Sequence, residues 1–111
     1  MHVAELIDKV RVYNPGAPAE PIEKAWEFSA EVHRGQTRRS GEPYLVHPIH
    51  VASIIADMKL DVPSVVTGLL HDTVEDTLAT LDDIKRMFGE EVARLVDGVT
   101  KLTRIELQSE V

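Results

Sequence analysis

Apolar residues recur every three or four positions along most of the chain, which is the spacing of an amphipathic helix. No segment alternates as a strand, and no repeat occurs. The pattern predicts an all-α fold, a compact bundle of about six helices. The expected helices span residues 3–12, 21–34, about 48–58, about 62–70, 81–88, and from about 90 to 102.

Local start and stop signals separate these segments. Gly35 is a natural end for the second helix, and the Gly-, Ser- and Pro-containing stretch 35–48 reads as an ordered loop. Asp61 is placed to cap the fourth helix. Thr80 and Asp83 have the spacing of a capping box for the fifth.

The same spacing predicts which side of each helix is buried. On the second helix, His33 lies on the apolar stripe. We therefore expect it in the core, or in contact with the metal ligands, rather than as a ligand itself. The residues expected on the buried side of the third helix are Val51, Ile54, Ile55 and Met58. Those of the last helix are Val92, Leu95, Val96, Val99 and Leu102.

The composition is that of one folded domain, because 111 residues with 43% hydrophobic content suffice for a single core. The chain has no cysteine, which excludes disulfides, thiolate metal sites and cysteine nucleophiles. No apolar run approaches the roughly 20 residues of a membrane span, and the N-terminus lacks a signal-peptide pattern. We expect a soluble, cytoplasmic protein.

The net charge of −7 argues against nucleic-acid binding, because phosphate backbones are bound by positive surfaces. The charge is unevenly distributed. Residues 33–50 contain three arginines and one acid, whereas residues 71–83 contain five acids and no lysine or arginine. The two patches suit a ligand that carries phosphates together with a metal ion, although two solvated faces of opposite sign are the alternative.

The segment GLLHDTVEDT ends an apolar run in His71 and Asp72, and histidine with carboxylate binds divalent ions such as Mn²⁺, Zn²⁺ or Fe²⁺. Adjacent helical residues point about 100° apart, so this pair can hold one ion only at a helix end that faces a cleft. Glu75 and Asp76 lie one turn further on, where a carboxylate can take a proton from water acidified by a metal. The alternative is a helix C-terminus capped by His71 with solvated acids, although acids are disfavoured there.

His47 is a further candidate ligand, because a histidine at the start of one helix can face a His-Asp pair at the end of another. In the same loop, Arg38 and Arg39 stand beside Ser40. Arginine binds phosphate as a bidentate fork and can stack on a base; solubility is the alternative role. His50 is less attractive as a ligand and could equally face solvent.

Three segments, HRGQTRRSGEPYLVHP, GLLHDTVEDT and FGEEVARLVDGVTKL, resemble in this order the N-terminal hydrolase domain of the RelA/SpoT family. These bifunctional Rel enzymes make and degrade the alarmone (p)ppGpp of the stringent response. The resemblance implies an HD-type helical bundle that hydrolyses (p)ppGpp to GDP or GTP and pyrophosphate with Mn²⁺ bound. Some members that lost the His-Asp pair only synthesise; this sequence keeps the pair and looks hydrolase-competent.

The resemblance also implies the site residues. His47, His71 and Asp72 match the metal ligands of the family. Glu75 and Asp76 match the acidic pair that activates or positions the attacking water.

Arg38 and Arg39 match the basic pair beside the guanine and the phosphates, although the family often has Arg-Lys, and Ser40 is a weaker candidate for a nucleotide contact. The family's metal site needs one more aspartate from a later helix. We therefore expect residues 1–111 to be a partial domain, an N-terminal fragment without synthetase and regulatory domains, and weakly active or inactive alone. Its exposed apolar surface is expected to be covered in a homodimer or by exchanged helices.

Other functions are compatible with parts of this pattern. An HD phosphohydrolase acting on another nucleotide need not carry the arginine loop. A non-catalytic interaction or folding fragment would explain the absence of the last aspartate. A helical DNA-binding module is disfavoured by the acidic balance.

Overall fold

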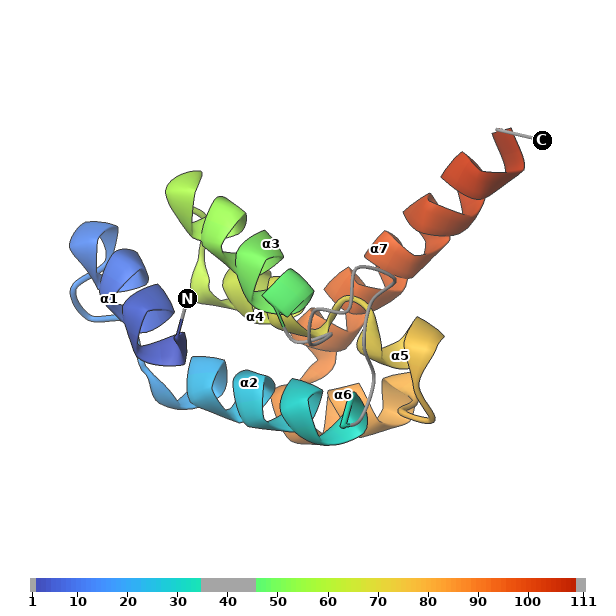
Figure 1. The fold of residues 1–111 in the computed structure, drawn as a ribbon, viewed down its shortest axis with the longest axis horizontal. Coiled ribbons are helices and arrows are strands. Elements are labelled where there is room, and N and C mark those ends of the chain that lie inside the picture. Colours follow the sequence, from blue (N-terminus) through green and yellow to red (C-terminus); the bar gives the residue numbers. More distant parts are fainter. Residues whose placement is uncertain (1, 35–45, 110–111) are drawn as a thin grey trace.

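The computed structural model describes the backbone of residues 2–34 and 46–109, and the side chains of residues 2–34 and 47–102. Every regular element in these ranges is a helix, which confirms the predicted all-α fold (Figure 1). The helices are α1 Val3–Tyr13, α2 Glu20–Val32, α3 Val46–Asp57, α4 Val62–Leu70, α5 Thr73–Asp76, α6 Leu81–Phe88 and α7 Glu90–Ser109.

Helix α4 forms the centre of the core, and α2, α3 and α7 pack against it. Its residues Val65, Val66, Leu69 and Leu70 are each at most 1% exposed. A helix with apolar residues on every side is stable only when neighbours cover all of them. The position of α4 therefore follows from its composition.

Two helix starts have the caps that the sequence predicts. The Asp61 carboxylate accepts a hydrogen bond from the Ser64 N–H at 3.0 Å and begins α4. The side chains of Thr80 and Asp83 each accept from the other's backbone N–H, at 3.2 and 3.0 Å, and begin α6. These contacts confirm both predicted caps.

Polar contacts hold α1 along α3. The Lys9 Nζ donates to Ser53 Oγ at 2.8 Å and forms an ion pair with Asp57 at 2.6 Å. One turn further along, at the end of α1, the Tyr13 hydroxyl donates to the Leu60 carbonyl at 2.7 Å. The first helix thereby braces the helix that carries His47.

The predicted buried side of α3 is wrong. Ile54 and Met58 are 48% and 64% exposed, whereas Ala52 and Ala56 are at most 2% exposed. Small side chains on the buried side let the backbone of α3 approach α4 closely, so the larger apolar residues point outward. The other two residues of the predicted side, Val51 and Ile55, are half-buried.

Helix α7 begins at Glu90, as expected, and buries Val92 and Val96. The prediction that Leu95 and Leu102 are buried is wrong, because they are 38% and 67% exposed. The second half of α7 projects away from the other helices in Figure 1, where nothing in the described ranges covers it. Neither α7 nor any other described helix combines the length and apolar character that crossing a membrane requires.

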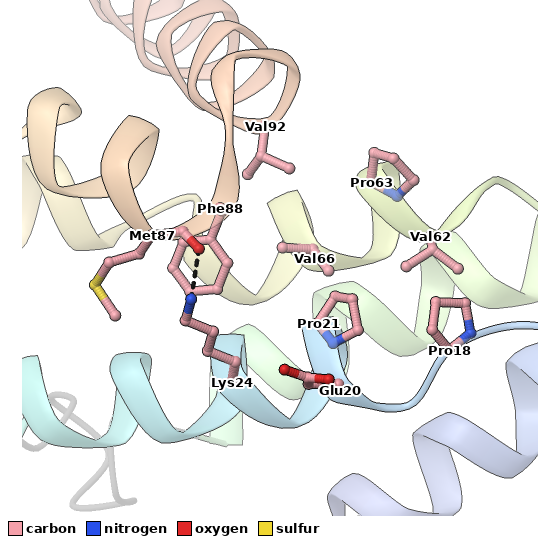
Figure 2. Close-up of a pocket in the computed structure, with 10 residues that line it drawn as sticks. All are labelled: Pro18, Glu20, Pro21, Lys24, Val62, Pro63, Val66, Met87, Phe88 and Val92. Carbon is pink, nitrogen blue, oxygen red and sulfur yellow. Dashed lines mark hydrogen bonds between the residues drawn. The ribbon is translucent and has the colours of Figure 1, made fainter.

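A mainly apolar groove of about 560 Å³ lies between the starts of α2 and α4 and the α6–α7 junction (Figure 2). At this groove the Lys24 Nζ donates to the Met87 carbonyl at 2.6 Å and lies 5.3 Å from the centre of the Phe88 ring. Carbonyls in the last turn of a helix lack partners within that helix. Lys24 provides such a carbonyl of α6 with a hydrogen-bond donor and thereby links α2 to α6.

Candidate functional site

The three predicted ligands meet where α3, α4 and α5 come together. His47 lies in the first turn of α3, His71 is the C-cap of α4, and Asp72 is the N-cap of α5. Asp72 Oδ1 is 3.0 Å from His71 Nε2, and Asp72 Oδ2 is 3.4 Å from His47 Nε2. The antiparallel course of α3 and α4, seen in Figure 1, brings the start of one to the end of the other.

The spacing of these side chains suits a single metal ion. One ligand atom from each of His47, His71 and Asp72 can be chosen so that all three lie within 4.8 Å of one another. Nitrogen and oxygen ligands lie about 2.0 to 2.2 Å from a divalent ion, so small side-chain rotations would let the three share one. His71 and Asp72 are 15% exposed and His47 is 31% exposed, which leaves the His47 side more open to solvent.

The His71 ring is held by its own helix. Its Nδ1 lies 2.7 Å from the Gly68 carbonyl oxygen, which can only accept, so Nδ1 carries the proton and Nε2 faces Asp72. Burial lowers the pKa of His71, but the hydrogen bond and charge of Asp72, the Gly68 carbonyl and the charge of Asp76 outweigh it and raise the pKa above its ordinary value. The surroundings therefore favour positive charge at this ring.

His71 and Asp72 lie at the junction where α4 ends and α5 begins. The Thr73 hydroxyl donates to the Leu70 carbonyl at 2.8 Å and helps to end α4. The Asp76 N–H donates to the Asp72 carbonyl at 2.9 Å and closes α5. His71 and Asp72 keep right-handed helical backbone angles across this junction, with φ −57° and ψ −31° at His71 and φ −94° and ψ −7° at Asp72. Their side chains still come together, because Asp72 Oδ1 lies 3.0 Å from His71 Nε2.

Glu75 and Asp76 lie on α5, exposed, outside the group of three ligands. Both line a hollow of about 760 Å³ that also borders Phe28 and Glu31. The charge of Asp76 contributes to the raised pKa of His71, so Asp76 acts electrostatically on the ligand group. Carboxylates in this position can accept a proton from water beside the site.

The structure describes only two of the remaining candidate residues, His33 and His50. Arg38, Arg39 and Ser40 lie outside the described residues, as does most of the predicted loop 35–48, whose last residues belong to α3 instead. His33 is 3% exposed at the end of α2, in agreement with the core role expected for it, and His50 is exposed.

Two features of the site were not predicted. The predicted helices did not include α5 as a separate element, and no role was predicted for Gly68. A glycine inside an otherwise apolar helix often has a packing reason, and this signal could have identified it. The alternative view of His71 as a helix cap is also correct in part, because the same ring that faces Asp72 binds a carbonyl of α4.

The sequence is similar to a known domain family and to several known proteins. The sequence pattern of the HD domain family matches residues 25–110. A GTP pyrophosphokinase from Myxococcus xanthus is 59% identical over 95 residues, which cover 86% of this chain and 12% of that protein. A guanosine-3′,5′-bis(diphosphate) 3′-pyrophosphohydrolase from Aquifex aeolicus is 49% identical over 92 residues, covering 83% of this chain and 13% of that protein.

The fold is also similar to a solved structure, that of a metazoan orthologue of SpoT that hydrolyses ppGpp. The TM-score is 0.69 at 34% sequence identity, over 74% of this chain and 48% of the other. The chain thus spans 12 to 13% of the length of the two sequence relatives and about half of the solved chain.

Proposed function

Because the chain belongs to the HD domain family, whose members normally bind a divalent metal ion, we propose that it contributes to a metal-dependent site that removes the 3′-pyrophosphate from ppGpp or pppGpp. The observation that carries the proposal is that His47 meets the adjacent pair His71 and Asp72, which come more than 20 residues later in the sequence. The Aquifex aeolicus relative, named for this hydrolysis, and the SpoT orthologue support the choice of substrate.

His47, His71 and Asp72 would hold the ion, and their two ring nitrogens and carboxylate suit Mn²⁺. When bound, the ion would acidify water and polarise the phosphate under attack. Glu75 and Asp76 would take the proton from that water, since both carboxylates are solvent-accessible on the adjoining α5. Without the ion, the two Asp72 oxygens lie 3.0 Å from His71 Nε2 and 3.4 Å from His47 Nε2, so the same three ligand atoms already face one another.

Arg38 and Arg39, with Ser40 beside them, would bind the guanine nucleotide, because guanidinium forks match phosphate oxygens and stack on bases. They precede α3 in sequence by a few residues, and His47 lies in the first turn of that helix. In the reaction, water replaces the ribose 3′ oxygen at phosphorus. GDP or GTP and pyrophosphate are the products.

We propose that residues 1–111 are a partial hydrolase domain and that one further acid from outside them completes the metal site. The coverage of 48% of the solved SpoT orthologue is in keeping with this. Three ligands hold an ion less tightly than four, so we expect the chain alone to be a slow enzyme. The absence of cysteine supports a cytoplasmic location.

The test is pyrophosphate release from ppGpp with Mn²⁺ and with EDTA, for the unmodified chain, Asp72→Ala and Asp8→Ala. We expect release that requires Mn²⁺, is lost in Asp72→Ala and persists in Asp8→Ala, whose side chain is exposed on α1. Loss of a ligand or its partner typically lowers metal affinity by about 10- to 100-fold. Circular dichroism on each variant would verify that the helices are intact.

The same assay separates the alternatives. Turnover that is insensitive to EDTA or to Asp72→Ala would contradict the proposed site. Hydrolysis of GTP, which lacks a 3′-pyrophosphate, as fast as ppGpp would favour an HD phosphohydrolase of other specificity. A folded chain without any Mn²⁺-dependent release would favour a non-catalytic interaction fragment.

We also propose that a second copy of the chain, packed as a homodimer or with exchanged helices, covers the exposed apolar side chains on α3 and α7. Ile54 on α3 and Met58, which directly follows α3, are 48% and 64% exposed, and Leu95 and Leu102 on α7 are 38% and 67% exposed. Large apolar side chains that remain exposed are often covered by association with another chain.

A further inference from the structure

Gly68 lies at a close approach between α4 and α3, the two helices that carry the candidate histidines. A Cβ atom added at Gly68 would lie 2.7 Å from Ile55 Cδ1, 3.0 Å from Ala52 Cα and 3.3 Å from the Ala52 backbone nitrogen. Carbon atoms at optimal separation lie about 3.5 to 4.0 Å apart. Ile55 could turn its terminal carbon away, but the backbone at Ala52 could move only if α3 moved as a whole.

The same residue fixes the ring of one ligand. The Gly68 carbonyl accepts the Nδ1 proton of His71 at 2.7 Å. A histidine must be neutral to bind a metal ion, and in the neutral ring this bond keeps the one proton on Nδ1. Nε2, which lies 3.0 Å from Asp72 Oδ1, is then the nitrogen that can bind the ion. Groups that accept the second N–H of a metal-binding histidine orient the ring and set its tautomer.

Gly68 lies close to both candidate histidines along their helices, so a movement of the backbone at Gly68 would also move His47 relative to His71. His71 follows Gly68 by three residues, about 4.5 Å along α4, and His47 precedes Ala52 by five residues, about 7.5 Å along α3. Both helices are rigid over such lengths. A displacement of a few tenths of an ångström between Ala52 and Gly68 therefore changes the separation of His47 from His71.

Helix propensity alone does not explain a glycine here. Glycine in a helix interior destabilises it by about 1 kcal/mol relative to alanine, and α4 is otherwise built of strongly packed residues. Gly68 has no side chain to contribute to the core. The cost of this glycine to helix stability is offset by the close packing against Ala52 that its missing Cβ permits.

We propose that Gly68 is a positioning residue of the metal site: its missing side chain sets the distance between α3 and α4, and its carbonyl directs His71 Nε2 toward the ion. This inference rests on the proposed metal site and deepens it. It assigns to one backbone position both the spacing between the two histidines and the orientation of His71.

The experiment measures Mn²⁺ affinity by calorimetry for the unmodified chain, Gly68→Ala and Gly98→Ala. Gly98 lies inside α7 with no atom within 4 Å of an added Cβ, so it is a matched control. We expect Gly68→Ala to weaken Mn²⁺ binding by roughly tenfold and Gly98→Ala to leave it unchanged. Adding Ile55→Val to Gly68→Ala removes the Cδ1 atom at 2.7 Å and should restore part of the affinity.

A spectroscopic measurement complements the affinities and does not depend on a variant that folds. In the Zn²⁺-loaded unmodified chain, nitrogen NMR should show His71 with a metal-bound Nε2 and a protonated Nδ1. Binding through Nδ1, or Mn²⁺ affinity unchanged in Gly68→Ala, would overturn the role of Gly68 alone. Failure of the unmodified chain to bind either ion would overturn the metal site itself and, with it, this role.

Discussion

At the scale of single residues, Gly89 determines where one helix stops and the next begins. Its φ of 96° and ψ of 170° belong to a region that residues with side chains essentially avoid. Its N–H donates to the Lys85 carbonyl at 3.0 Å and ends α6, while its carbonyl accepts from the Ala93 N–H at 3.2 Å and begins α7. One residue thus serves both helices.

Gly89→Ala should lower the free energy of unfolding by about 1 to 3 kcal/mol, the cost of forcing a side chain into this backbone conformation. Urea denaturation followed by circular dichroism would measure it. Gly98→Ala is the control, because alanine there meets no neighbouring atom and should stabilise α7 by up to about 1 kcal/mol. Equal stability of Gly89→Ala and the unmodified chain would contradict the described turn.

At the scale of elements, helix starts were predictable and helix orientation was not. The caps at Asp61 and Thr80 involve side chains and N–H groups within three residues of each other, so the sequence contains all that decides them. The buried side of α3 depends on what packs against it. Ala52 faces the core because α4 presents Gly68 at that point, and hydropathy favoured Ile54 and Met58 instead.

The cap of α6 should have a defined pH dependence. The Thr80 backbone N–H and hydroxyl, followed by Arg86, lower the pKa of Asp83 in the folded chain. A lowered folded pKa contributes stability above the unfolded value, about 3.9, and this contribution is lost as pH falls through the folded value. The stability difference between the unmodified chain and Asp83→Asn should therefore be present at pH 7 and disappear well below pH 3.9.

Thermal unfolding of both proteins across this range would measure the effect, with Asp8→Asn on α1 as a control for net charge. A difference that grows toward acid pH would contradict the described contacts of Asp83.

At the scale of the whole molecule, the meeting of His47 with His71 and Asp72 was predictable, whereas the detailed geometry of this group was only partly so. The residue types at 47, 71 and 72 and the antiparallel pairing of two helices pointed to one site. The break that sends Asp72 to the start of α5 depends on Thr73 bonding the Leu70 carbonyl, and hydroxyl groups of this kind give no periodic signal.

The proposed association also belongs to this scale. Light scattering should give a mass near twice the 12.4 kDa of the chain, and Ile54→Asp with Met58→Asp should reduce it to one chain. The charges would be buried unpaired in an interface at α3. Val12→Asp is the control, since Val12 is 84% exposed on α1. A strictly monomeric unmodified chain would contradict the proposal.

The two helices that carry the candidate ligands are consecutive, joined only by residues 58–61. Contacts between neighbours in sequence form with a small loss of loop entropy, so helical hairpins assemble early in folding. Because His47, His71 and Asp72 all belong to this hairpin and its immediate continuation, we expect them to meet before α7 has docked. In a cell, a divalent ion could then be captured while the later part of the chain is still leaving the ribosome.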